Sequence, residues 1–469
     1  MKIKVETDSK AFAGGGFLAF RQADHLLNHE MCRLIDEQCP SRGVPISKRV
    51  ELLLGQVIHG FKSTRGAWEN AKNTNAVAFV NQKMSKQNVR NFYRSIEDLG
   101  AANSEELYEK IASIALQKTG ISIAIVHADT TSQYFTGKKA ARAKKGYSRD
   151  HRPDELQINV GIIQVKNTHI ISAYIVAPGN QHDTAIFVKL VYSTKLGALI
   201  VGDRGVASKE NKAFVIESGR HYLFGEKLYG PVKREALAAL PLMKRVREGY
   251  FVYSIKTGCE WRHYFLSEKL REDVRETRKR HARTTASEYA ENLSKKKRGS
   301  KVKRFTRITA EGEEVIVQRE IITRRLFSKT PDQILAELSK DDPLDGVFVL
   351  SSDLVSDAAQ ALAEYKCKDE VEKVFCALKG SLHLRPFHAR KQACVDGVIF
   401  ITMLALLVVS LLAFCSRATG VAVKTLVEEL RRVTLLVVIS AKKQIQRVSC
   451  LNLDGWAKKL LGSMNFNAV

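Results

Sequence analysis

The sequence predicts a multidomain α/β fold, because stretches typical of buried strands alternate with helix-like stretches along a long chain. Residues 121–128 and 197–202 form short apolar runs rich in isoleucine and valine, which are typical of strands covered on both faces of a sheet. The chain has 469 residues, more than one hydrophobic core usually organises, so we expect two or three domains.

The first part of the chain, residues 1–118, is expected to be mainly helical. Ser47 opens the stretch SKRVELLL, which is typical of a capped helix. Residues 85–94, SKQNVRNFYR, offer basic and amide side chains to a DNA groove, as a recognition helix does. A purely structural helix is an equally good interpretation, because helix-turn-helix signals in one sequence are weak. We expect a DNA-binding domain here.

From residue 119 onward the pattern changes to strands. We expect strands at 121–128, 157–165, 170–177, 199–202 and 222–224, with one helix before the fourth strand and another after it. This β-β-β-α-β-α-β order is that of an RNase H-like catalytic domain. Residues 119–229 would form its first part and 346–415 its second part. Residues 230–345 interrupt this layout with two strand-like pieces around a highly charged middle, and the family resemblance given below implies that they form a β-rich insertion domain. Residues 416–469 would form a basic helical C-terminal segment.

Three acidic residues stand where such a fold can bring carboxylates together. Asp129 and Asp203 each follow an apolar run, and α/β sheets bind ligands beyond the carboxyl ends of their strands. Helix geometry selects the third acid, because at about 100° per residue Glu372 lies within about 60° of Tyr365, Lys368 and Lys379. Glu370 falls on another face. The alternative is a solvated helix face with Glu-Lys pairs. Asp183 could support the site or cap a helix.

The charge of the chain favours a polyanionic partner. Lysine and arginine number 75 against 50 acidic residues, which leaves a net charge of +25. Nucleic acid is the usual partner of such a protein, and an anionic membrane is the competitor. Basic residues concentrate in 137–152 and in 295–304. We expect the second run to contact DNA phosphates through Lys295, Lys296, Lys297 and Arg298, although a solvated loop is the alternative.

One apolar segment bears on the membrane alternative. Residues 397–415 carry no charge over nineteen positions, so the segment could span a bilayer or form a buried helix. We interpret it as a core helix, because it stands alone and follows a helix with a polar face. The eight cysteines show neither a C-x-x-C motif nor zinc-ligand spacing, which favours a reduced, cytoplasmic protein.

The spacing Tyr365-x2-Lys368-x3-Glu372-x6-Lys379 resembles the Y-(2)-R-(3)-E-(6)-K signature of DDE transposases of the insertion-sequence-4 superfamily. The resemblance continues through Asp129-Thr-Thr-Ser, Gly202-Asp-Arg-Gly205 and Leu382-His-Leu-Arg-Pro-Phe-His388, and it covers roughly residues 10 to 415. One position departs from the pattern: Lys368 stands where the signature has arginine. Lysine keeps the charge and loses the two-pronged grip on phosphate.

The resemblance implies a transposase that cleaves the inverted-repeat ends of its element, through a hairpin, and joins them to target DNA. Asp129, Asp203 and Glu372 would hold two Mg²⁺ or Mn²⁺ ions, and Tyr365, Lys368 and Lys379 would hold the terminal phosphates. The first and fourth strands would be neighbours, so that Asp129 and Asp203 meet. The enzyme would act as a homodimer on double-stranded DNA at the nucleoid, without a membrane partner.

Two other functions are compatible with the sequence. A metal-dependent structure-specific nuclease would use the same chemistry, and a domesticated DNA-binding protein without mobility would have lost one of the acids. Trp261, in the expected insertion, could stack on a base flipped out of the duplex, although packing is the more common use of such a tryptophan.

Overall fold

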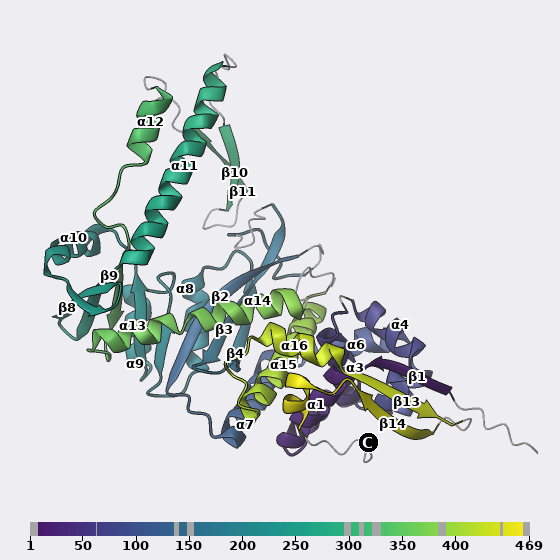
Figure 1. The fold of residues 1–469 in the computed structure, drawn as a ribbon. Coiled ribbons are helices and arrows are strands. Elements are labelled where there is room, and N and C mark those ends of the chain that lie inside the picture. Colours follow the sequence, from purple (N-terminus) through teal and green to yellow (C-terminus); the bar gives the residue numbers. More distant parts are fainter. Residues whose placement is uncertain are drawn as a thin grey trace, which may run out of the picture. The chain divides into compact units, whose positions relative to one another are not determined.

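The computed structural model describes residues 8–61, 63–135, 140–147, 154–294, 302–308, 314–320, 330–382, 391–440 and 444–462. Figure 1 shows the fold as a ribbon. The contacts within the structure divide the chain into two compact units. Unit 1 takes in Met1–Val201, Ser208–Arg220 and Lys366–Val469, and unit 2 takes in Gly202–Ala207 and His221–Tyr365. Each unit is therefore assembled from separate stretches of the sequence.

The strands of unit 1 lie in the order β4-β3-β2-β5. They are β2 (Ile125–Phe135), β3 (Leu156–Val165), β4 (Ile171–Pro178) and β5 (Leu199–Gly202). β2, β3 and β4 pair in antiparallel fashion. The backbone N–H of Leu199 donates to the carbonyl oxygen of Ala124 at 2.8 Å, so β5 begins beside the start of β2 and runs in the same direction. The expected neighbours, the first and fourth strands, are confirmed.

Helices dominate the beginning of unit 1, as expected from the sequence. After β1 (Asp8–Ala13), the helices are α1 (Gly15–Leu26), α2 (Glu30–Gln38), α3 (Ile46–Ile58), α4 (Thr64–Asn73), α5 (Ala76–Val80), the 3-10 helix η1 (Gln82–Lys86), α6 (Val89–Ala101) and α7 (Ser104–Thr119). The expected recognition helix over 85–94 begins only at Val89, because η1 ends at Lys86 and the next two residues have extended backbone. Arg90 and Arg94 are exposed on α6.

The apolar segment forms α15 (Gln392–Cys415), which lies at the centre of the helices of unit 1 (Figure 1). It packs against α1, α3, α6 and α7. Within the part of the chain that the structure describes, it is the one helix long and apolar enough to cross a membrane, and 83% of its most apolar window is buried inside the protein. A helix covered on every side needs no polar face, which explains its uniform composition.

α15 and α6 cross backbone against backbone, and two glycines allow it. A Cβ atom on Gly100 of α6 would stand 1.8 Å from the carbonyl oxygen of Ala393. A Cβ atom on Gly397 of α15 would stand 2.0 Å from the carbonyl oxygen of Ile96. Backbone atoms cannot move aside as a flexible side chain can, so only glycine fits at either position.

The C-terminal part corrects the sequence-based expectation of a helical segment. It contains α16 (Val423–Arg432) and α17 (Gly455–Leu461), with β13 (Thr434–Ile439) and β14 (Ile445–Leu451) between them. The strands pair in the order β1-β13-β14, so the first strand of the chain joins the last two. In β13 every second residue is buried, which is the period of a strand and explains why this stretch is not helical.

The strands of unit 2 lie in the order β6-β12-β9-β8-β7, all antiparallel. They are β6 (His221–Glu226), β7 (Lys244–Arg247), β8 (Tyr250–Thr257), β9 (Glu260–Ser267) and β12 (Val347–Ser352). β9, from the expected insertion, pairs with β12, the strand at which the main domain was expected to resume. Trp261 on β9 is partly buried, and its ring lies parallel to that of His263 on the same face of the strand, at a centroid distance of 6.4 Å.

Unit 2 also contains α10 (Gly230–Ala239), the short 3-10 helix η2 (Leu240–Leu242), a long charged helix and a hairpin. α11 (Glu268–Ser294) packs against α12 (Pro331–Leu338), and β10 (Val302–Ile308) pairs with β11 (Glu314–Glu320). Arg278 of α11 bonds to both carboxylate oxygens of Asp345 and lowers the pKa of that group to about 2. This ion pair fixes α11 to the turn before β12.

Candidate functional site

Asp129 lies within β2 and not beyond its end, which corrects the sequence-based interpretation. β2 continues to Phe135 because the residues after Asp129 keep pairing with β3, from Asp129 opposite Ile162 to Phe135 opposite Leu156. One carboxylate oxygen, Oδ1, accepts the backbone N–H of Thr130 at 2.8 Å. The side chain is 22% exposed. Asp129 thus offers its carboxylate from the body of the sheet.

A second carboxylate stands beside β2. The hydroxyl of Thr130 donates to Oδ1 of Asp183 at 2.8 Å. Asp183 is the first residue of α8 (Asp183–Tyr192), and His182 occupies the N-cap, so the expected capping role of Asp183 is wrong. A negative charge in the first turn is still favoured by the helix dipole. The bond joins α8 to β2 next to Asp129.

Asp203 belongs to unit 2 and directly follows β5. Its Oδ1 accepts the backbone N–H of Arg204 at 2.8 Å and the hydroxyl of Tyr365 at 3.1 Å. Tyr365 lies near the end of α13 (Ala358–Lys366). The sequence assigns Tyr365 to a phosphate, whereas the structure places its hydroxyl on a carboxylate.

The stretch 365–379 is not the single helix that the sequence predicts. α13 ends at Lys366, α14 (Asp369–Cys376) begins three residues later, and the π-helical turn η3 (Ala377–Ser381) follows. A wheel drawn from Tyr365 to Lys379 therefore crosses two changes of geometry, and its premise is wrong. The sequence does not reveal the first break, because no glycine or proline stands there and every residue is compatible with a helix.

Within α14 itself, the structure separates the two candidate glutamates. Glu372 is exposed in the first turn, whereas Glu370 is partly buried. Burial raises the pKa of Glu370, even though His169, Lys373 and the backbone of Asn167 favour its charged form. Glu370 is thus turned toward the connection between β3 and β4. α14 lies against β2, the strand that carries Asp129.

The expected phosphate-binding lysines differ in their surroundings. The Lys368 side chain is 11% exposed, and its ammonium lies 3.9 Å from Oδ2 of Asp129. Lys379 is partly buried on η3. The run Lys295, Lys296, Lys297 and Arg298 lies outside the described residues, as does most of the motif 382–388.

Of the other basic run, Arg142 is anchored within the protein. Its guanidinium lies 3.3 Å from Asp396 on α15 and 3.7 Å from Glu105 on α7. Its backbone N–H donates to the side-chain oxygen of Gln392. Arg142 therefore holds this basic run onto the helices α7 and α15.

The donor chemistry of the three acids suits a hard divalent cation, because Mg²⁺ and Mn²⁺ prefer carboxylate oxygen. Asp129 and Glu372 come from contacting elements of unit 1, and Asp203 comes from unit 2. Among the residues that the structure describes, no set of three or more histidine, cysteine, aspartate or glutamate side chains is arranged to hold a metal ion. The residue types of the three acids therefore fit such a metal ion.

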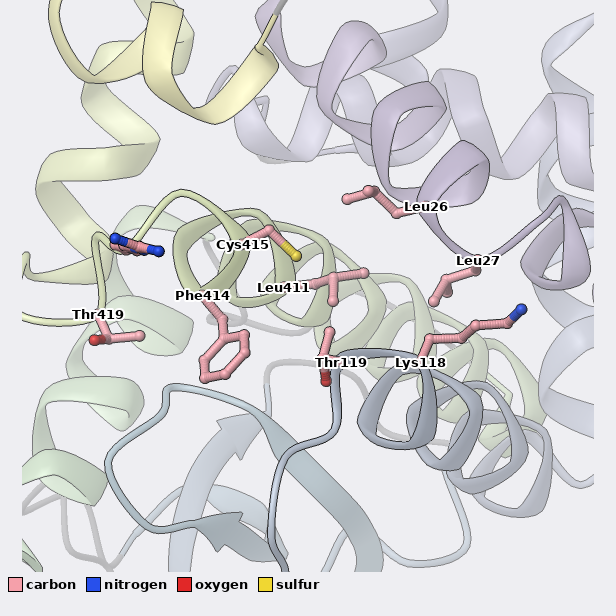
Figure 2. Close-up of a pocket in the computed structure, with 9 residues that line it drawn as sticks. Leu26, Leu27, Lys118, Thr119, Leu411, Phe414, Cys415 and Thr419 are labelled. Carbon is pink, nitrogen blue, oxygen red and sulfur yellow. The ribbon is translucent and has the colours of Figure 1, made fainter.

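A cavity of about 480 Å³ lies among the helices of unit 1 (Figure 2). Apolar side chains from α1 and α15, among them Leu26, Leu411 and Phe414, line it together with Lys118. None of the three candidate acids contributes to its wall. It is therefore a separate feature and not the candidate catalytic site.

Comparison with known proteins identifies the family to which this chain belongs. Residues 120–408 match the family model described as the transposase DDE domain. A solved structure, a piggyBac transposase synaptic complex with hairpin DNA determined by cryo-electron microscopy, is similar with 10% sequence identity and a TM-score of 0.41, over 91% of this chain and 82% of that chain. No curated protein matches. Because the family model spans more than half of the chain and contains all three candidate acids, this protein belongs to the DDE transposases, enzymes of DNA transposition and recombination.

Proposed function

We propose that this protein is the transposase of an insertion sequence of the insertion-sequence-4 superfamily. It binds the terminal inverted repeats of its element, cleaves them through a hairpin, and joins them to target DNA as a homodimer on paired ends. The observation that carries the proposal is the family match over residues 120–408, within which Asp129, Asp203 and Glu372 all fall.

We propose that these three acids act together at one site. Asp129 lies on β2 in unit 1, Asp203 directly follows β5, and both fall within the stretch that the family model covers. Glu372 lies on α14, which contacts β2. Clustered carboxylates repel one another unless cations neutralise them, so such an arrangement is expected at functional sites and is unfavourable elsewhere.

Two Mg²⁺ or Mn²⁺ ions held by the three acids would activate the attacking oxygen and stabilise the leaving oxygen of a phosphodiester. The remaining residues act by position and charge. Lys368 and Lys379 supply positive charge near the scissile phosphate, and Lys295, Lys296, Lys297 and Arg298 neutralise phosphates along the duplex without reading its sequence. Tyr365 was expected to bind phosphate as well, and its hydrogen bond to Asp203 supports a role in positioning that carboxylate instead.

The decisive experiment begins with the DNA that flanks the coding sequence. Inverted repeats on either side define the candidate ends, and a linear DNA carrying one end is incubated with the purified protein and Mg²⁺ or Mn²⁺. We expect a product that migrates on a denaturing gel as one continuous strand of double length, because a hairpin joins the two strands. A DNA with scrambled repeats is the control. Cleavage of branched DNA of any sequence, without cleavage at the repeats, would identify a structure-specific nuclease instead.

Lys368 provides a test of the phosphate role. Lys368→Gln is expected to lose about 1–3 kcal/mol of charge-assisted bonding, which slows cleavage by roughly 5- to 150-fold. Lys368→Arg is expected to retain or improve activity, because arginine restores the fork that the family signature has at this position. The measurement is the single-turnover cleavage rate of a candidate end.

Lys373→Gln is the control for Lys368, because it removes an exposed lysine from α14, the helix whose N-cap is Lys368. It should leave the cleavage rate near that of the unmodified protein. If Lys368→Arg is as slow as Lys368→Gln, the phosphate role is lost. The 3.9 Å approach of Lys368 to Asp129 would then define its function.

A further inference from the structure

A strand glycine in unit 2 lies directly under the hydroxyl group of Tyr365. Gly225 is the fifth residue of β6 and pairs with Leu350 of β12. A Cβ atom on Gly225 would stand 2.5 Å from the Tyr365 hydroxyl oxygen, 3.2 Å from the ring carbon Cζ and 3.3 Å from the backbone nitrogen of Arg204. The first of these distances is shorter than any normal non-bonded contact, so a side chain at this position would displace Tyr365.

The backbone of Gly225 does not itself require glycine. Gly225 is not one of the glycines with positive φ, and it lies within a regular antiparallel ladder. Glycine weakens a strand, because it has no side chain to pack and loses more conformational freedom on folding than other residues. A glycine in the interior of a strand therefore marks a place where another group must approach closely. Here that group is the phenol of Tyr365.

The phenol reaches Asp203 from this position. Oδ1 of Asp203 accepts both the Tyr365 hydroxyl at 3.1 Å and the backbone N–H of Arg204 at 2.8 Å. Two donors on one oxygen restrict rotation of the carboxylate about its Cβ–Cγ bond. Gly225 underlies both donors, because its missing side chain leaves room for the tyrosine hydroxyl and for the nitrogen of Arg204.

We propose that Gly225 and Tyr365 are positioning residues that together orient the Asp203 carboxylate for the cleavage reaction. The proposal rests on the proposed function, in which Asp203 is a metal ligand. Hydrogen bonds to ligating carboxylates orient them, and removing such a partner typically costs 10- to 100-fold in metal affinity or activity. The role of Tyr365 is thus to hold a carboxylate of the site, and the role of Gly225 is to admit the tyrosine.

The test compares Gly225→Ala, Tyr365→Phe and the double variant. Tyr365→Phe is expected to slow cleavage of a candidate end roughly 10- to 100-fold and to weaken Mn²⁺ binding, measured by calorimetry without DNA, by a similar factor. Gly225→Ala is expected to do the same and also to lower the unfolding midpoint, because the methyl group pushes the hydroxyl away. In the double variant the clashing oxygen is absent, and the closest remaining ring atom lies at 3.2 Å.

The double variant decides the question. We expect it to cleave as Tyr365→Phe does, without further loss, and to unfold at a higher temperature than Gly225→Ala. Losses in cleavage that multiply would overturn the proposal, because they would mean that the two residues act independently. An unchanged Mn²⁺ affinity in both single variants would also overturn it.

Two control variants distinguish the positioning role from a general loss of stability and from a failure of the proposed function. Val349→Ala removes buried volume on the neighbouring strand β12, so it destabilises unit 2 without touching Tyr365 and should leave Mn²⁺ affinity unchanged. Asp203→Asn tests the proposed function itself. If Asp203→Asn cleaves normally, the proposed function fails at this residue. If Asp203→Asn is inactive while Gly225→Ala behaves as the unmodified protein does, only the positioning role fails.

Discussion

Replacing Asp129, Asp203 or Glu372 with alanine is expected to abolish DNA cleavage and strand transfer while binding to element ends is largely retained. Metal-assisted stabilisation of charge in the transition state amounts to several kcal/mol, so each substitution should slow cleavage by at least about 10³-fold. The rates are measured on a pre-cleaved and an uncleaved end, which separates strand transfer from cleavage, and binding is measured by gel shift.

The first turn of α14 provides matched controls for Glu372. Asp369 is exposed in the same turn, and Glu370 is partly buried toward the connection between β3 and β4. Asp369→Ala and Glu370→Ala should each reduce cleavage far less than Glu372→Ala. If Glu370→Ala is inactive and Glu372→Ala is active, the assignment of the third acid is wrong.

The largest effect on stability is expected where α6 crosses α15. Gly100→Ala and Gly397→Ala each place a methyl group about 2 Å from a backbone carbonyl oxygen. Overpacking of this kind typically costs 1–3 kcal/mol, and the contact with rigid backbone places both variants at roughly the upper end of that range. The measurement is the midpoint of denaturant unfolding followed by circular dichroism.

Gly380→Ala is the control for the helix crossing. No atom lies within 4 Å of the Cβ position at Gly380, and its φ is not positive. A Gly→Ala change at such a compatible helical position stabilises a protein by about 0.4–1 kcal/mol. Because Gly100 and Gly397 belong to one crossing, their double variant should lose less stability than the sum of the two single losses. Unfolding midpoints unchanged by either substitution would show that the helices can move apart freely.

The elements that the sequence predicts well are those with local signals. The strands near 157–165, 170–177 and 199–202 lie within one residue of the observed bounds, because their apolar runs are bordered by polar or turn residues. The strand around Asp129 is misjudged because polar residues such as Thr131 and Gln133 continue it, and these residues pair with β3 without forming an apolar run. β13 is missed because its partner strand β1 lies more than 400 residues away, and β14 pairs only with β13.

The roles of the candidate site residues also depend on contacts between distant parts of the sequence. Sequence alone names Asp203, Tyr365 and Lys368 from spacing and resemblance. It does not show that the Tyr365 hydroxyl bonds to Asp203 across 162 residues, or that Lys368 approaches Asp129. Gly225 has no local signal in the sequence, because it directly follows the expected strand 222–224, and only the position of Tyr365 explains it. These roles depend on contacts between residues that are far apart in the sequence, and the periodicity of a single segment cannot predict such contacts.

The pairing of β1 with β13 delays the completion of folding during synthesis on the ribosome. β1 ends at Ala13 and its partner β13 begins at Thr434, so more than 400 residues are synthesised between the two strands. At about 5–20 residues per second, roughly 20–80 s separate the synthesis of the two strands. Until α15 has been synthesised, the apolar faces that it covers on α1, α3, α6 and α7 stay exposed. Such exposed apolar surface binds chaperones. A chain terminated before Gln392 would lack both α15 and β13, so we expect it to be degraded and not to persist as a truncated competitor for the same DNA.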